Sequence, residues 1–176
     1  MSRLRRLLAC ERGFSLVELL QVTVILAVVL GALTTIFVRA MNSEVEMNRR
    51  FQAQQEARLA VDKMRREIHC ASSVTPIGAS NSITITLPAQ CPSAGGSQAN
   101  IVYDTQFVST NRYRLRRAGV KIADYITAAT VFDYTAPATG KLANLRVDLP
   151  VNLNPAETGK TWRLVGDMVL RNTTRL

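Results

Sequence analysis

The first segment with a clear chemical character surrounds Gly13. Residues 13–20 are Gly-Phe-Ser-Leu-Val-Glu-Leu-Leu, and Glu18 is followed by a run without charged side chains from 19 to 38. A carboxylate at the head of a membrane-length apolar run is costly to bury unless another charge pairs with it. Because glycine has no Cβ, the backbone at Gly13 can enter a peptidase site without a side-chain clash. The segment therefore predicts a pairing partner for Glu18 and a backbone at Gly13 that is open to a peptidase.

Two simpler interpretations of this segment stay open. Four arginines precede the apolar run, and the combination also fits a signal anchor that is never cleaved. Glu18 also lies near enough to a membrane surface to be solvated there without any role.

A second candidate site is a row of arginines. Arg112, Arg114 and Arg116 occupy alternate positions, so a strand would point all three to one face, with Tyr113 on the other. A basic strand face with a tyrosine nearby can bind an anion, such as the phosphate backbone of single-stranded DNA. More often such a row is a solvated sheet face or meets acidic residues of a partner subunit.

The remaining residues predict neither an enzyme nor a metal site. His69 is the single histidine, and the sequence has no carboxylate pair, glycine-rich phosphate loop or nucleophile elbow. Asn152, Asn154 and Glu157 lack the dense acidic spacing of a calcium site, and we interpret their segment as a turn. The cysteines lack zinc spacing. We expect no catalytic residue, no metal and no cofactor.

We predict that Phe14 and Glu18 lie at the start of one long helix, which continues to near His69. Roughly 20 apolar residues span a bilayer, so 14–38 is long enough to do so. Residues 39–69 contain no proline or glycine, and their apolar side chains recur at three- and four-residue steps. This stripe consists of Ala53, Ala57, Ala60, Val61, Met64 and Ile68.

The rest of the chain alternates with a period of two, which is typical of strands. We predict a loop over 70–81 and strands at 83–87, 101–104, 112–117, 120–125, 130–134, 145–149 and 161–170. The predicted fold class is α+β, a long N-terminal helix packed on an antiparallel sheet.

The run Gly-Phe-Ser-Leu-Val-Glu behind a basic leader resembles the prepilin family of type IV pili and type II secretion pseudopilins. The resemblance implies that a prepilin peptidase cuts between Gly13 and Phe14 and that the new amine of Phe14 is methylated. It also implies that Glu18 pairs with this amine on a neighbouring subunit during assembly. Residues 113–117, 119–120, 131–134 and 168–172 look like J-type pseudopilins and W-type minor pilins.

Loss of the leader would change both the charge and the cysteines. The chain carries +9, and removal of four arginines and Glu11 takes away a net three charges, leaving +6. Cys10 would leave as well, so Cys70 and Cys91 remain as an even pair in an exported domain. Exported domains meet oxidising conditions, which predicts a disulfide between them; two separate buried thiols are the alternative.

The predicted organisation has four segments. They are a removed basic leader at 1–13, a transmembrane and filament-core helix at 14–38, an amphipathic helix at 39–70 and an exported β-rich domain at 71–176. The basic leader would hold the N-terminus in the cytoplasm, as a single-pass protein of the inner membrane before it enters a periplasmic or extracellular filament.

The resemblance implies a minor pilin or pseudopilin that helps to initiate or cap a type IV pilus or a type II secretion pseudopilus. Its partners would be the prepilin peptidase, the inner membrane and other pilins through 14–38. A DNA- or surface-binding minor pilin of a competence or adhesion pilus is the alternative function. A membrane-anchored domain unrelated to filaments is the third hypothesis.

Overall fold

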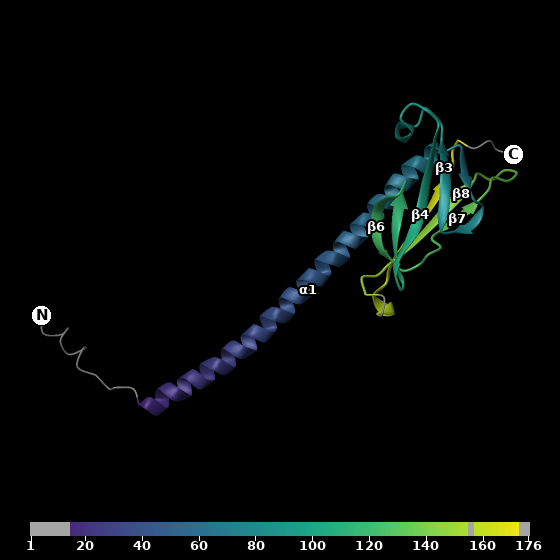
Figure 1. The fold of residues 1–176 in the computed structure, drawn as a ribbon. Helices are drawn as coiled ribbons and strands as arrows, with labels where there is room; N and C mark the ends of the chain where they lie inside the picture. The colour runs from purple at the N-terminus through teal and green to yellow at the C-terminus, as the bar shows by residue number, and fades with distance from the viewer. Residues whose placement is uncertain (1–14, 155–156, 173–176) are drawn as a thin grey trace, which may run out of the picture. The chain divides into compact units, whose positions relative to one another are not determined.

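The computed structural model describes residues 15–154 and 157–172 of the 176-residue chain (Figure 1). It divides into two compact units, Met1–Glu46 and Met47–Leu176. Helix α1, Leu16–Cys70, contributes to both units. Gly13 and Phe14 lie outside the described residues.

Helix α1 is continuous from its first turn to Cys70, including Gly31, in agreement with the single long helix predicted to near His69. The amide groups of Glu18 and Leu19 both donate to the carbonyl oxygen of Ser15, at 2.9 and 3.2 Å, so the helix opens at Ser15. Threonines inside the apolar run return their hydroxyl groups to helix carbonyls, as Thr34 does to Leu30 at 2.7 Å. These hydroxyl groups are therefore hydrogen-bonded without a partner from another helix.

The described residues after the helix form one antiparallel sheet of nine strands. The strands are β1 (Ser73–Thr75), β2 (Gly78–Ser80), β3 (Ser82–Leu87), β4 (Ala99–Ser109), β5 (Arg112–Arg117), β6 (Val120–Ile126), β7 (Phe132–Thr135), β8 (Asn144–Val151) and β9 (Trp162–Val169). Their order is β1-β3-β4-β5-β6-β8-β7-β2. Strand β9 lies outside this order and pairs with β8, while β6 and β7 pair with different parts of β8.

The predicted loop over 70–81 is wrong in part, because β1 and β2 lie within it. Each has three residues, which is too short to display an alternating pattern. They exist as strands because they pair with the longer strands β3 and β7. Strand β4 likewise continues five residues beyond the predicted 101–104 and pairs there with β5, with a register shift between Phe107 and Ser109.

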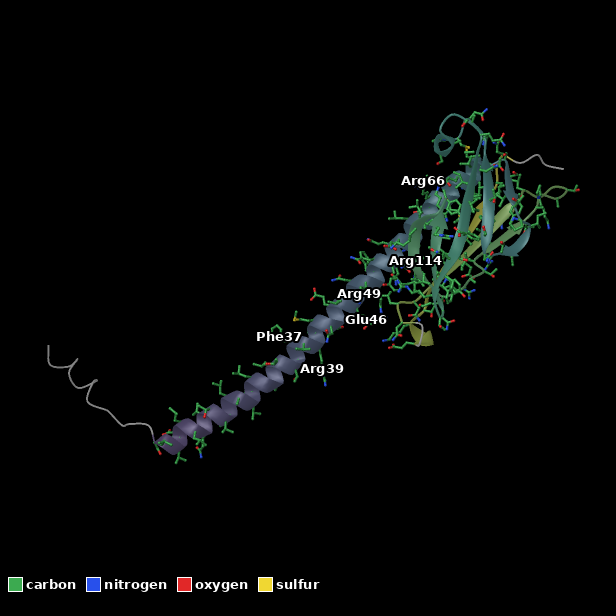
Figure 2. The ribbon with its side chains drawn as sticks, in the orientation of Figure 1. Phe37, Arg39, Glu46, Arg49, Arg66 and Arg114 are labelled. Atoms are coloured by element: carbon green, nitrogen blue, oxygen red, sulfur yellow. A yellow bond between two sulfur atoms is a disulfide. The ribbon has the colours of Figure 1, made fainter. Side chains whose placement is uncertain are left out.

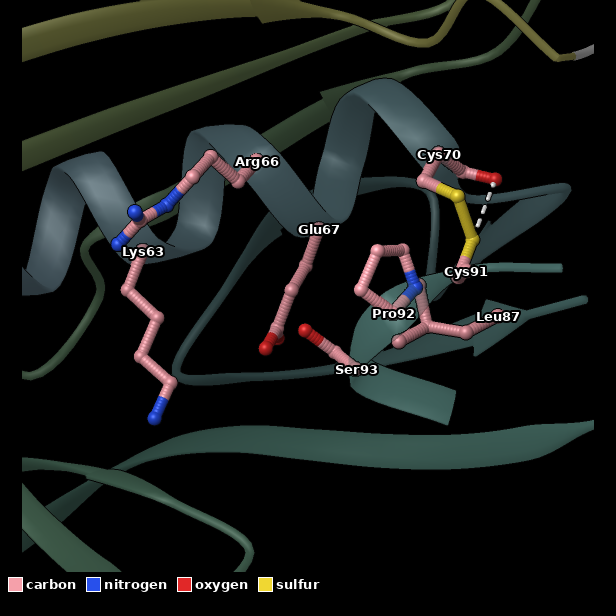
Figure 3. Close-up of a pocket in the computed structure, with 8 residues that line it drawn as sticks. All are labelled: Lys63, Arg66, Glu67, Cys70, Leu87, Cys91, Pro92 and Ser93. Carbon is pink, nitrogen blue, oxygen red and sulfur yellow. Dashed lines mark hydrogen bonds between the residues drawn. A yellow bond between two sulfur atoms is a disulfide. The ribbon is translucent and has the colours of Figure 1, made fainter. Parts of the chain in front are cut away.

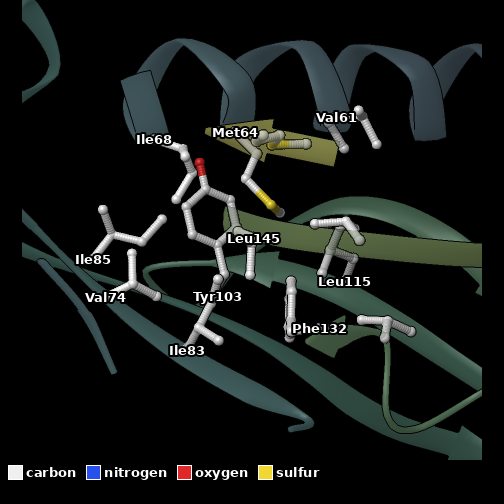
Figure 4. Close-up of a cluster of buried hydrophobic side chains, with 14 of the residues drawn as sticks. Val61, Met64, Ile68, Val74, Ile83, Ile85, Tyr103, Leu115, Phe132 and Leu145 are labelled. Carbon is white, nitrogen blue, oxygen red and sulfur yellow. The ribbon is translucent and has the colours of Figure 1, made fainter. Parts of the chain in front are cut away.

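The core lies between the C-terminal part of α1 and one face of the sheet (Figure 4). All six apolar residues of the predicted helical stripe are buried, which confirms the amphipathic helix. Gly166 on β9 permits this close approach, since a Cβ there would lie 3.2 Å from Cγ1 of Val61. The largest buried side chains of the sheet include Tyr103, Phe132 and Leu145.

A disulfide joins Cys70 to Cys91, with a Cα–Cα distance of 6.0 Å. It is the pair that the sequence predicts. Cys70 is the last residue of α1, and Cys91 lies in the connection between β3 and β4. The bridge therefore ties the end of the helix to the sheet that it covers.

Replacing Cys70 and Cys91 together with alanine is expected to lower the free energy of unfolding by about 3 kcal/mol, because the bridge closes a loop of about 20 residues in the unfolded chain. Denaturant titration of the oxidised protein and of the double variant measures this difference. Wild-type protein kept in reductant should match the variant. Equal midpoints for the oxidised and reduced wild type would contradict the expectation.

Candidate functional site

Glu18 lies in the first turn of α1, where a carboxylate interacts favourably with the helix dipole. Ser15 and Glu18 also have the spacing of a capping box, in which the glutamate of the third helical position faces the backbone of the capping residue. This spacing is a local signal that can be read from the sequence alone. The charge pairing of Glu18 with a neighbouring subunit stays a prediction, as do the cleavage and methylation at Gly13 and Phe14.

The apolar part of α1 meets the length and composition of a membrane span. Among the described residues it is the one such helix, with a mean hydropathy of 2.4 over 18 residues, none of them buried by the rest of the chain. A signal sequence near an N-terminus passes the same test. The apolar run ends between Phe37 and Arg39, after which charged side chains begin (Figure 2).

The three arginines of the predicted row, Arg112, Arg114 and Arg116 on β5, all have carboxylate partners within the domain. Arg112 donates from Nε to Oδ1 of Asp124 and from Nη2 to Oδ2, each at 3.2 Å. Arg114, labelled in Figure 2, donates from Nε to Oδ2 of the same carboxylate at 3.3 Å. Arg116 pairs with Asp104 on β4. The row is therefore an intramolecular ion-pair network, an arrangement that the sequence analysis did not consider.

A β-bulge places Asp124 beside this row. Leu115 pairs with Ala123 and Tyr113 with Ile126, so Arg114 alone lies opposite two residues of β6, Asp124 and Tyr125. Bulges redirect side chains in this way. Tyr125 adopts a left-handed backbone with φ 61°, which is strained for a residue other than glycine.

The bulge also brings a ring against the arginines. The guanidinium carbon of Arg112 lies 4.1 Å from the ring centroid of Tyr125, which is a cation–π contact. The hydrogen bond to Asp124 raises the pKa of Arg112. Burial works to raise the pKa of Asp124, but the hydrogen bonds from Arg112 and from the Tyr125 amide, with the charges of Arg112 and Arg114, hold that pKa below its ordinary value.

A second charged network lies between the helix and the sheet. The hydroxyl of Tyr103 donates to Oε2 of Glu67 at 2.6 Å, and Arg117 Nη2 lies 2.8 Å from Oε1. The Glu67 side chain is 1% exposed. Burial raises the pKa of Tyr103, and the hydrogen bond and charge of Glu67 raise it further. Sequence reasoning missed Glu67, although its position on the stripe between Met64 and Ile68 was a signal for burial.

Glu67 also borders a cavity of about 520 Å³ at the end of α1 (Figure 3). Its other lining residues come from the helix, the end of β3 and the connection after it. They are Lys63, Arg66, Cys70, Leu87, Cys91, Pro92 and Ser93. Because Arg117 and Tyr103 already occupy both oxygens of Glu67, this carboxylate is a structural group and not a free acid or base.

The segment around Asn152 folds as a turn closed by its own side chains. The amide nitrogen of the Asn152 side chain donates to the carbonyl oxygen of Glu157 at 2.9 Å, and its Oδ1 accepts from the amide of Asn154 at 3.0 Å. Glu157 pairs with Lys160. Within residues 15–154 and 157–172, no group of three or more His, Cys, Asp or Glu side chains gathers as a metal site would require.

Residues 8–34 match the family model described as the prokaryotic N-terminal methylation motif. The match includes the junction at Gly13 and Phe14, Glu18 and most of the apolar run, and it is consistent with the type IV prepilin and pseudopilin family. The motif covers 27 of the 176 residues, and the α+β architecture of the described residues is pilin-like. No curated protein and no solved structure matches the chain.

Proposed function

We propose that the protein is a minor pilin or pseudopilin that is cleaved after Gly13 and helps to initiate or cap a type IV pilus or a type II secretion pseudopilus. The observation that carries the proposal is the methylation motif at residues 8–34, which heads a helix with two different surfaces. The buried stripe of α1 lies wholly after residue 52, against its own sheet. The apolar side chains of 16–38 are all exposed.

These exposed side chains require another apolar environment. In a membrane they contact lipid, and in a filament they contact the corresponding helices of neighbouring subunits. Because lipid and helix surfaces are similarly apolar, packing and polar pairing decide the exchange between the two environments. Pairing of the Glu18 carboxylate with a charge on a neighbouring helix would fix the axial position of one subunit against the next.

The continuity of α1 supports a low-copy subunit. Many major pilins carry a proline towards the end of the apolar run, where the helix can loosen. This chain has no proline between residues 14 and 75, and α1 passes Gly31 without interruption. An uninterrupted helix suits a subunit that begins or ends a filament better than one repeated along its length.

Intact mass and N-terminal sequencing of the chain from its native membrane test the processing step. We expect a chain that begins at Phe14 and carries the mass of one additional methyl group. Substitution Gly13→Leu should leave the leader attached, because a bulky side chain then enters the peptidase site.

A matched control is Gly31→Leu, since nothing lies within 4 Å of the Cβ position of Gly31. This variant should be processed like the wild type. A wild-type chain that begins at Met1 or Ser2 would overturn the proposal and support the signal-anchored domain.

A further inference from the structure

We propose that the Asp124 cluster, which consists of Arg112, Arg114, Lys121, Asp124 and Tyr125, is a docking site for carboxylates of an acidic segment on a neighbouring protein subunit. The identity of the partner as a filament subunit rests on the proposed function. The chemistry of the site rests on the geometry of β5 and β6 alone.

The cluster holds more positive than negative charge. Arg112 Nη2 at 3.2 Å, Arg114 Nε at 3.3 Å and Lys121 Nζ at 3.9 Å all face one carboxylate oxygen of Asp124. Three cations around one anion leave an excess of two positive charges. The Asp124 side chain is 7% exposed, whereas those of Arg114 and Lys121 are 40% and 49% exposed, so the excess charge faces solvent.

The arginines also retain hydrogen-bond donors. A guanidinium has five N–H groups in a planar fork. Among the described residues, Arg114 reaches a carboxylate through Nε only, and its terminal amino groups make no such bond. Arg112 reaches Asp124 through Nε and Nη2, which leaves Nη1. These planar donors match the geometry of an incoming carboxylate.

The site is held in place before any ligand arrives. Asp124 fixes Arg112 by two hydrogen bonds, and the Tyr125 ring supports the same guanidinium from one side. The strained backbone at Tyr125 and the adjacent bulge are the features that bring both groups to Arg112. A preorganised cation loses less conformational entropy when an anion binds. Strain and bulges of this kind are concentrated at functional positions.

The neighbouring residues favour carboxylates over nucleic acid. Arg116 is paired one to one with Asp104, and Arg117 with Glu67. The excess positive charge is therefore confined to the Asp124 cluster and does not continue along β5. Nonspecific binding of single strands requires a basic groove with aromatic rings free for base stacking. One face of the Tyr125 ring is already covered by Arg112.

The test uses the full chain in detergent micelles and a fluorescent hexaglutamate peptide, with binding followed by anisotropy at two salt concentrations. We expect the double substitution Arg114→Gln with Lys121→Gln to weaken binding about tenfold at low salt, because two of the three facing cations are lost. The matched control, Lys141→Gln with Arg146→Gln, removes one lysine and one arginine from exposed positions elsewhere and should bind like the wild type.

The single variant Lys121→Gln keeps the bonds of both arginines to Asp124. It should weaken binding less than the double variant does and should unfold at the wild-type temperature. An equal loss in the control pair, or no binding of hexaglutamate by the wild type, would overturn the proposal. Tighter binding of an oligothymidylate of equal charge, lost in the Arg114/Lys121 variant, would overturn it in favour of nucleic acid. Because the assay needs no filament, failure of the subunit function would appear instead as failure of processing at Gly13.

Discussion

Replacing Glu18 with glutamine is expected to leave the subunit in the membrane and to remove it from filaments. In the proposed assembly, the carboxylate meets the processed amine of Phe14 on a neighbour. Without that partner the amine remains charged among apolar helices, at a cost of about 2.5–3.5 kcal/mol. Since about 1.4 kcal/mol corresponds to a factor of ten, incorporation should fall about a hundredfold.

The measurement is the fraction of the subunit recovered in sheared filaments relative to membranes. Glu44→Gln provides the control, because Glu44 is an exposed glutamate of the same helix beyond the apolar run. Cleavage after Gly13 should be normal in both variants. If Glu18→Gln enters filaments as the wild type does, the carboxylate has only a local role at the start of the helix.

Replacing Glu67 with leucine is expected to lower the free energy of unfolding by about 3 kcal/mol, because removal of one partner strands the other charge of a buried pair. We place the value at the low end of the usual range because the Arg117 side chain is 20% exposed and retains some hydration. The Tyr103 hydroxyl also loses its acceptor. For a unit of this size the melting temperature should fall by on the order of 10 °C.

Thermal unfolding followed by circular dichroism measures this loss. Glu56→Leu removes the same charge from a partly exposed position of the same helix and should have a much smaller effect. The double variant Glu67→Leu with Arg117→Met should recover part of the stability, since an apolar pair can replace a buried ion pair of similar volume. Strict additivity of the two single effects would show that the pair does not act as a unit.

The sequence predicts those parts of the fold that depend on local pattern. The helical stripe from Ala53 to Ile68 could be identified because burial against one surface imposes a period of 3.6 residues. The longer strands could be identified for the corresponding reason with a period of two. The strands β1 and β2 could not be, because three residues carry too little pattern and their conformation depends on pairing with β3 and β7.

The charged networks depend on distant parts of the chain, and the sequence analysis missed them for that reason. Glu67 meets Arg117 across 50 positions of sequence. The arginine row was recognised, but its partner Asp124 was not, because a regular strand would not bring both Asp124 and Tyr125 beside one arginine. Only the bulge in β6 does so. The predicted processing at Gly13, by contrast, rests on a short local motif that can be recognised without any knowledge of the fold.

The bridge between Cys70 and Cys91 determines how tension would pass through a subunit in a filament. Once the packing of the buried stripe from Ala53 to Ile68 yields, a pull on α1 reaches Cys70 and crosses the sulfur atoms directly to Cys91, in the connection before β4. Strands β1, β2 and β3 all lie within the closed loop, so they are shielded from the load. The loop also withholds roughly 65 Å of contour length that an unbridged chain could release, at about 3.3–3.6 Å for each residue. The connection between Cys70 and Cys91 would therefore keep its length under load.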